Sequence, residues 1–123
     1  MTQDYAPTAL KVLSAWWAIN ALRMIIDPEG AGSQWGFPAL DDIGKGWMQA
    51  FGHGLLAQGL LFGAMAFFDY DALKAIGVGS ISWLLYHLWG MFGGRDEKLG
   101  VPQKPMFFWT AYHIFVIYMT LLS

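Results

Sequence analysis

Three histidines carry the clearest chemical signal in this 123-residue sequence. His53, His87 and His113 each lie in a different long apolar stretch. Counted at about 1.5 Å per helical residue from the nearer end of its stretch, each histidine lies roughly 8 to 10 Å deep. Asn20 lies at a similar depth in a further stretch, six residues before Ile26. The sequence therefore predicts a layer of polar side chains at one level.

The last two histidines occur in the same local pattern, Trp-x-x-Tyr-His. A spacing of four places Trp83 on the helix face of His87, and Trp109 on the face of His113. Neutral imidazole is an axial ligand for haem iron, and it could serve chlorophyll magnesium in the same way. Flat aromatic side chains suit the plane of a tetrapyrrole. One hypothesis is therefore haem or chlorophyll ligated by one of the histidines, with Trp83, Trp109 and Asn20 beside it.

Two other interpretations of the polar layer remain open. Three histidines that converge on one point could hold zinc or another divalent metal with one open position. They could instead form hydrogen bonds between helices and have a structural role only. No carboxylate lies inside any apolar stretch, so an acid–histidine proton relay lacks its usual partner. Four acidic residues of the long loops could cover the layer or be solvated, as charged loops usually are: Asp41, Asp42, Asp96 and Glu97.

The charged residues divide the chain into segments. Hydrophobic residues make up 56% of it and charged residues only 13%, about half the usual share for a soluble domain. Four apolar stretches remain, at residues 8–26, 47–68, 72–92 and 106–122. Each is long enough to cross about 30 Å of hydrocarbon as a helix, and a helix satisfies its own backbone in lipid. The sequence predicts an all-α, four-helix transmembrane bundle that forms a single domain over residues 1–123.

The connections predict how these spans run. The turn at residues 69–71 is too short for anything but an antiparallel reversal, which favours an up-down bundle with both termini on one side. Cytoplasmic loops carry an excess of lysine and arginine. Two of these residues lie on the short-turn side, and five lie on the side of the long loops 27–46 and 93–105: Arg23, Lys45, Arg95, Lys98 and Lys104. We expect the long loops on the cytoplasmic, stromal or matrix side.

Small and charged residues predict specific contacts. One face of the second span carries four small residues, which indicates a close helix–helix contact: Gly52, Gly59, Gly63 and Ala66. Arg23 precedes Asp27 by four residues, a spacing that favours an ion pair on a helix. The net charge of −2, with no basic stripe, excludes a nucleic-acid-binding protein.

The two central spans carry a family resemblance. Phe51-Gly52 opens the second helix, a tight acidic turn follows at Asp69, and Trp83 and His87 come late in the third span. In these features the chain resembles the small four-helix scaffold family of sterol biosynthesis in the endoplasmic reticulum, and uncharacterised bacterial four-helix proteins of similar size. The resemblance implies tethering of other membrane proteins rather than catalysis.

Two classes of function follow. The sequence has no Gly-rich phosphate loop and no nucleophile-elbow motif, which speaks against an enzyme. The first hypothesis is an accessory or scaffold subunit of a larger membrane complex, whose partners are the lipid bilayer and other membrane proteins or further copies of this chain. The alternative is a membrane protein that binds a tetrapyrrole or a metal through its histidines, in electron transfer or photosynthesis.

Overall fold

The computed structural model describes residues 6–123, in which helices joined by short connections are the regular structure and no strand occurs. The long helices are α1 (Ala6–Ile26), α3 (Asp42–Phe68), α4 (Ala72–Phe92) and α6 (Gln103–Ile117). The last of these continues into a π-helical turn, η2 (Tyr118–Leu122). Two short helices, α2 (Pro28–Gln34) and α5 (Arg95–Leu99), lie in the connections. The predicted all-α class is confirmed for this part of the chain.

Four helices are long and apolar enough to cross a membrane, namely α1, α3, α4, and α6 together with η2. They coincide with the four predicted spans except at some of the ends. Helix α3 begins at Asp42, before the predicted start at Trp47. The side chain of Asp41 caps it, because its Oδ1 accepts a hydrogen bond from the amide of Gly44 at 2.7 Å. The first turn of α3 therefore lies outside the apolar stretch.

Helix α2 occupies part of the region predicted as a loop. Asp27 caps it by accepting a hydrogen bond from the amide of Gly30 at 3.0 Å, and Pro28 occupies the first helical position. The predicted ion pair between Arg23 and Asp27 is not formed. Arg23 donates to the side-chain oxygen of Gln34 instead, because the cap holds the Asp27 carboxylate at the start of α2.

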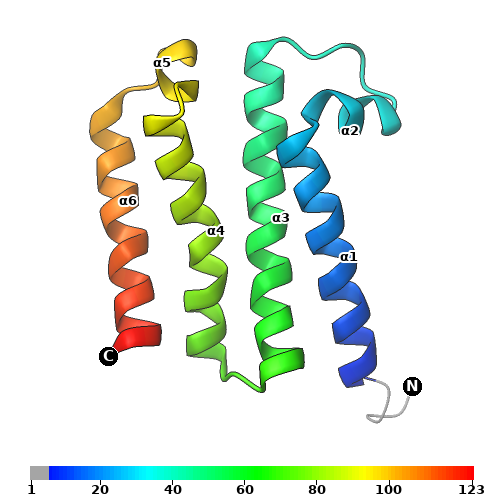
Figure 1. The fold of residues 1–123 in the computed structure, drawn as a ribbon, viewed down its shortest axis with the longest axis vertical. Helices are drawn as coiled ribbons and strands as arrows, with labels where there is room; N and C mark the ends of the chain where they lie inside the picture. Colours follow the sequence, from blue (N-terminus) through cyan, green and yellow to red (C-terminus); the bar gives the residue numbers. More distant parts are fainter. Residues whose placement is uncertain (1–5) are drawn as a thin grey trace.

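The long helices stand in one row, in the order α1, α3, α4, α6 (Figure 1). Helices α3 and α4 pack against each other in the middle, while α1 packs against α3, and α6 with η2 packs against α4. Helices α2 and α5 both lie at the upper ends of the long helices in Figure 1, opposite the α3–α4 turn. Each long helix therefore packs mainly against its neighbours in the chain.

Small residues let these helices approach closely. A Cβ atom at Gly52 would lie 2.9 Å from Cβ of Met24 on α1, and one at Gly59 would lie 3.2 Å from the carbonyl oxygen of Ser14. A Cβ at Gly79 on α4 would lie 2.8 Å from a backbone oxygen of α3. These contacts confirm that the glycine face of α3 meets another helix, as expected where dispersion rather than water drives association.

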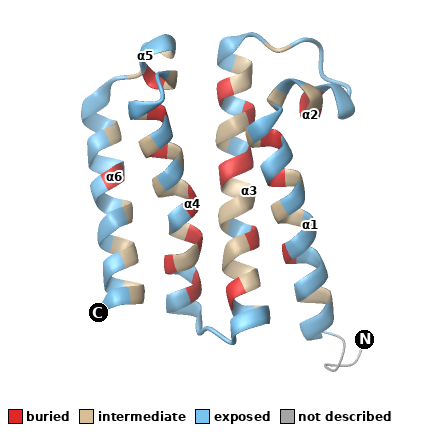
Figure 2. Cartoon of the chain, in the orientation of Figure 1, coloured by how far each residue is buried: buried red, intermediate tan, exposed pale blue. Residues whose placement is uncertain are grey.

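Large apolar side chains point outward instead of forming a core. Ile26 and Phe92 are each 79% exposed, whereas Ala21 and Ala75 are 0% exposed. Figure 2 shows the buried segments mainly along α1, α3 and α4, whereas α6 is mostly exposed. Water would penalise this much apolar surface. A hydrocarbon environment removes the penalty, which agrees with the length and hydropathy of the four spans.

Three residues join α3 to α4. Asp69 ends α3 in the left-handed conformation, with φ of 60°, and its amide donates to the carbonyl oxygen of Ala64. Asp71 begins α4, because its Oδ1 accepts a hydrogen bond from the amide of Lys74 at 2.9 Å. Both aspartates are exposed. The residues of the turn thus cap both the end of α3 and the start of α4, so that three residues suffice for the connection.

Candidate functional site

The three histidines lie on three neighbouring helices, and two of them are in direct contact. His53 belongs to α3, His87 to α4 and His113 to α6. The imidazole rings of His87 and His113 stack with centroids 5.3 Å apart and planes inclined by 21°. His53 and His87 are buried, with 8% and 7% of their surface exposed. A connected polar cluster thus crosses three of the four spans.

His53 is tied to α4 by reciprocal hydrogen bonds. Its Nδ1 lies 3.1 Å from the carbonyl oxygen of Ser82, and Ser82 Oγ donates to the carbonyl oxygen of His53 at 2.8 Å. A carbonyl oxygen can only accept, so Nδ1 of the neutral imidazole carries the proton and Nε2 remains an acceptor. Ser82 is fully buried. The pair therefore joins α3 to α4 through polar groups inside apolar surroundings.

Tyr86 connects this pair to the end of α4. Its ring centroid lies 5.3 Å from that of His53 and 5.8 Å from that of Trp83. The guanidinium carbon of Arg95, on α5, lies 3.8 Å from the centroid of the same ring, and Arg95 Nη2 donates to the Tyr86 carbonyl oxygen at 3.1 Å. A cation placed over an aromatic ring is stabilised, and more so away from water. Arg95 thus fastens α5 onto α4.

Asp96 is the buried carboxylate of the cluster. Of the two alternatives for Asp96, solvation is wrong, because only 2% of its surface is exposed. Arg95 neutralises it, because Nη2 and Nε donate to Asp96 Oδ1 at 3.1 and 3.2 Å. Gly90 makes room for both side chains, since a Cβ atom there would overlap them. Gly90 is three residues after His87, so Asp96 lies about one helical turn from that histidine.

Three buried polar atoms of this cluster have no hydrogen-bond partner within the described chain: His87 Nδ1, His113 Nδ1 and Asp96 Oδ2. Buried polar atoms in folded proteins are nearly always paired, with protein or with ordered water. Each of the three can accept a hydrogen bond or a proton, and an imidazole nitrogen can also ligate a metal centre. The cluster therefore has unused capacity to bind protons, water or a ligand.

The other predicted site residues divide between the cluster and its surroundings. Trp109 lies beside the histidine pair, with its ring centroid 6.5 Å from that of His113. Trp83 extends toward Gly54 on α3, where its ring atom Cζ2 lies 3.3 Å from the position of an added Cβ. Asn20 donates to the carbonyl oxygen of Trp16 in its own helix at 2.8 Å. Asn20 is thus on α1 and takes no part in the cluster.

A metal site built from three histidines is not assembled. Between residues 6 and 123, no group of three or more histidine, cysteine, aspartate or glutamate side chains is placed to hold a metal ion. His87 and His113 stack on each other, whereas the hydrogen bond of His53 is to Ser82 on α4. A shared zinc ion would require the three imidazole nitrogens to converge on one point.

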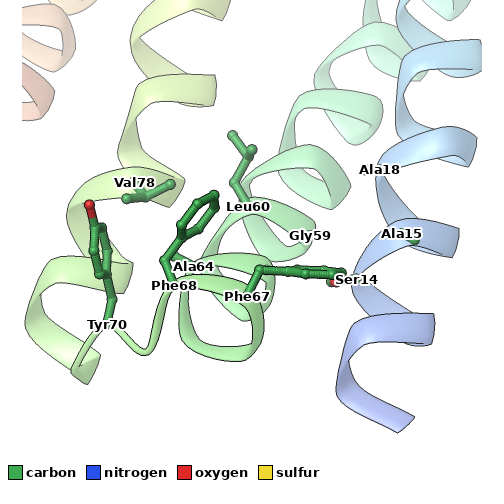
Figure 3. A pocket seen from close by; sticks show the side chains of 11 residues that line it. Ser14, Ala15, Ala18, Gly59, Leu60, Ala64, Phe67, Phe68, Tyr70 and Val78 are labelled. Atoms are coloured by element: carbon green, nitrogen blue, oxygen red, sulfur yellow. The ribbon is translucent and has the colours of Figure 1, made fainter. Parts of the chain in front are cut away.

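A separate hollow of about 350 Å³ lies beside α1, α3 and α4, at the α3–α4 turn (Figure 3). Its walls include the rings of Phe67, Phe68 and Tyr70, and the ring of Phe67 extends toward Ser14 of α1 (Figure 3). Neither a histidine nor a carboxylate lines it. This hollow is therefore distinct from the polar cluster.

No protein-family model, curated protein or solved structure matches this chain. The site is therefore interpreted from its own geometry.

Sequence reasoning found the histidines but missed the groups that hold them. Ser82 follows from no spacing rule, since nothing in the sequence pairs it with His53 across two helices. For Asp96 and Arg95, the sequence does contain a pattern that could have predicted their position. Gly90 stands one turn after His87, and the Gly-Gly pair at residues 93–94 allows the chain to fold back over it. A glycine between a buried histidine and a charged turn indicates space for a charged side chain.

Removing the Ser82 hydroxyl is expected to destabilise the α3–α4 contact. Ser82→Ala deletes the interhelical hydrogen bond to the carbonyl oxygen of His53, at a cost of about 1 kcal/mol. Ser80→Ala is the matched control, because its hydroxyl donates only to Ile76 in the same helix. Reversible unfolding in mixed detergent micelles measures both. Equal effects of the two substitutions would contradict a stabilising role for the His53–Ser82 pair.

Proposed function

We propose that this chain is a small, non-catalytic, multi-pass membrane protein that acts as an accessory or scaffold subunit of a larger membrane complex. The observation that carries the proposal is the position of α6. This helix packs against α4 and its own continuation η2, and Thr110 is its one buried residue. A span with a single neighbouring helix offers most of its surface to other molecules.

The composition of that surface suits protein partners. It is rich in exposed aromatic side chains, a residue class enriched where proteins meet: Phe107, Phe108, Trp109, Tyr112, Phe115 and Tyr118. In lipid, helices associate through packing and polar contacts rather than through exclusion of water. Rigid rings supply large packing area at little cost in conformational entropy. The resemblance to tethering scaffold proteins points in the same direction.

We further propose that the spans cross the membrane antiparallel, with both termini on one side and the long connections on the cytoplasmic, stromal or matrix side. The short turn that caps α3 and α4 supports the reversal. The grouping of α2 and α5 at one end (Figure 1) supports a common side for the long connections. Five of the seven lysine and arginine residues accompany them, which favours the cytoplasmic side.

Cysteine labelling tests this orientation, because the native chain contains no cysteine. A membrane-impermeant maleimide added to intact cells should label Tyr70→Cys in the α3–α4 turn. Ser33→Cys in α2 should react only after the membrane is permeabilised. The reverse pattern would contradict the proposed side, and labelling of both from outside would contradict the antiparallel arrangement.

Gentle detergent extraction from the native membrane should yield a particle far larger than the 13.7 kDa chain. The double substitution Phe108→Ala and Phe115→Ala on α6 should release the chain from this particle by removing packing area at the contact. The matched control is Trp16→Ala with Ile19→Ala, which removes exposed side chains from α1 at the other edge of the row. Native mass spectrometry measures the result and separates self-association from a hetero-complex. A stable monomer would overturn the scaffold proposal.

The histidine pair supports a second candidate, a tetrapyrrole bound through one imidazole. The favouring observation is that both His87 Nδ1 and His113 Nδ1 are buried and unpartnered. Rings stacked 5.3 Å apart leave no room for a macrocycle between them, so one histidine alone would ligate the metal. When bound, the tetrapyrrole would supply redox or light-absorbing chemistry.

The visible spectrum of protein purified from its native membrane tests this second candidate. A Soret or chlorophyll band should disappear in His87→Ala or in His113→Ala, whichever is the ligand. It should persist in His53→Ala, because both unpartnered imidazole nitrogens belong to His87 and His113. A colourless native preparation would eliminate tetrapyrrole binding, as would a band that survives all three substitutions.

A further inference from the structure

Two neighbouring hollows lie along α3 and share two lining residues, and we call the pair the groove. The larger, about 750 Å³, lies between the α2–α3 connection, α3 and Trp83 of α4. The smaller, about 380 Å³, continues along α3 and α4. Trp83 and Gln58 line both hollows and mark their junction. The groove extends along α3 from Gly44 to Phe62, about 27 Å at 1.5 Å per residue.

Gln58 is the unusual residue of this groove. It stands in the middle of the apolar stretch 47–68 and is exposed. Its amide forms no hydrogen bond with any other residue of the described chain, whereas Gln49 on the same helix donates to the carbonyl oxygen of Ile25 at 3.2 Å. Acyl chains offer no hydrogen-bond partner, so an unpaired amide at this depth is costly. An occupant with a carbonyl or hydroxyl oxygen would supply the missing partner.

The walls define the rest of the occupant. Around the larger hollow stand five aromatic residues: Trp35, Phe37, Trp47, Phe51 and Trp83. Aromatic faces pack well against another flat ring. Neither hollow is lined by a charged residue, so the occupant is neutral. The smaller hollow has about half the volume, and Leu61, Phe62 and Ile76 give it apolar walls that can pack against an apolar tail.

We infer that this groove binds a neutral, lipid-soluble molecule with a flat, carbonyl-bearing ring and an apolar tail, which is the chemistry of a prenylated quinone. The ring lies against Trp83, a carbonyl oxygen accepts from the Gln58 amide, and the tail follows one of the hollows. Gly54 is needed for this arrangement, because the Trp83 ring lies directly over it. The inference is independent of the scaffold proposal, which depends on α6, and of the histidines, none of which lines the groove.

The test is a titration of the intact chain in phosphatidylcholine nanodiscs with a benzoquinone that carries two isoprene units. Quenching of tryptophan fluorescence should saturate at about one quinone per chain. Gln58→Leu should weaken the apparent Kd roughly three- to tenfold, the range expected for one lost hydrogen bond. Gly54→Leu should abolish saturable quenching by filling the space beside Trp83. Ala15→Leu, in the separate hollow beside α1, should leave the Kd unchanged.

Each remaining outcome overturns the inference. Quenching that rises linearly and equally in all variants would show collision from the lipid phase and no site. A cholesterol titration, followed by the shift in Tm, distinguishes the ring chemistry. If cholesterol raises the Tm, and if Gln58→Leu and Gly54→Leu reduce this shift as strongly as they reduce the shift caused by the quinone, the occupant is a sterol and the inference of a carbonyl-bearing ring is wrong. Circular dichroism of each variant confirms folding, and a variant that fails this check is replaced by Gln58→Met or Gly54→Val.

Discussion

The hydrocarbon core of a membrane contains no water, and every polar group within a span must find its partner in the protein or in a bound molecule. The structure satisfies this requirement locally in most places. Thr110 and Thr120 donate to carbonyl oxygens of their own helix, at 2.7 Å each. Where a local partner is lacking, a helix–helix bond takes over, as between His53 and Ser82. The unpaired polar groups, at the histidine pair and at Gln58, are where the proposed ligands would find hydrogen-bond or coordination partners.

Much of the fold could be predicted from the sequence, because charge and hydropathy mark a membrane span directly. The helices end close to the predicted limits, and α4 has the limits 72–92 as expected. The glycine face of α3 was also recognisable, since spacing alone places Gly52 and Gly59 on one side of a helix. The short helices α2 and α5 were not predicted. Their length gives them little periodicity, and their caps depend on single aspartate or glycine residues.

The contacts between the helices could not be predicted from charge and hydropathy. The same is true of the His87–His113 stacking and of the burial of Asp96. The spans are apolar on all sides, so periodicity does not show which face meets which neighbour. For the same reason, the sequence does not predict that His87 stacks on His113, because this contact requires α4 and α6 to be neighbours. Asp96 appeared to belong in solvent because charged residues in loops usually do. Its burial depends on the Arg95 side chain and on the missing side chain of Gly90.

The single row of helices has a consequence for how the chain depends on its surroundings. Four helices in a closed bundle share an interior, but here both broad faces of the row are open to the bilayer (Figure 1). A layer one helix thick, about 10 to 12 Å, has a large perimeter for the protein mass it contains. Its boundary lipids are accordingly numerous relative to its residues. Bilayer thickness and lateral pressure therefore contribute to the free energy of this fold as internal packing does in a compact domain.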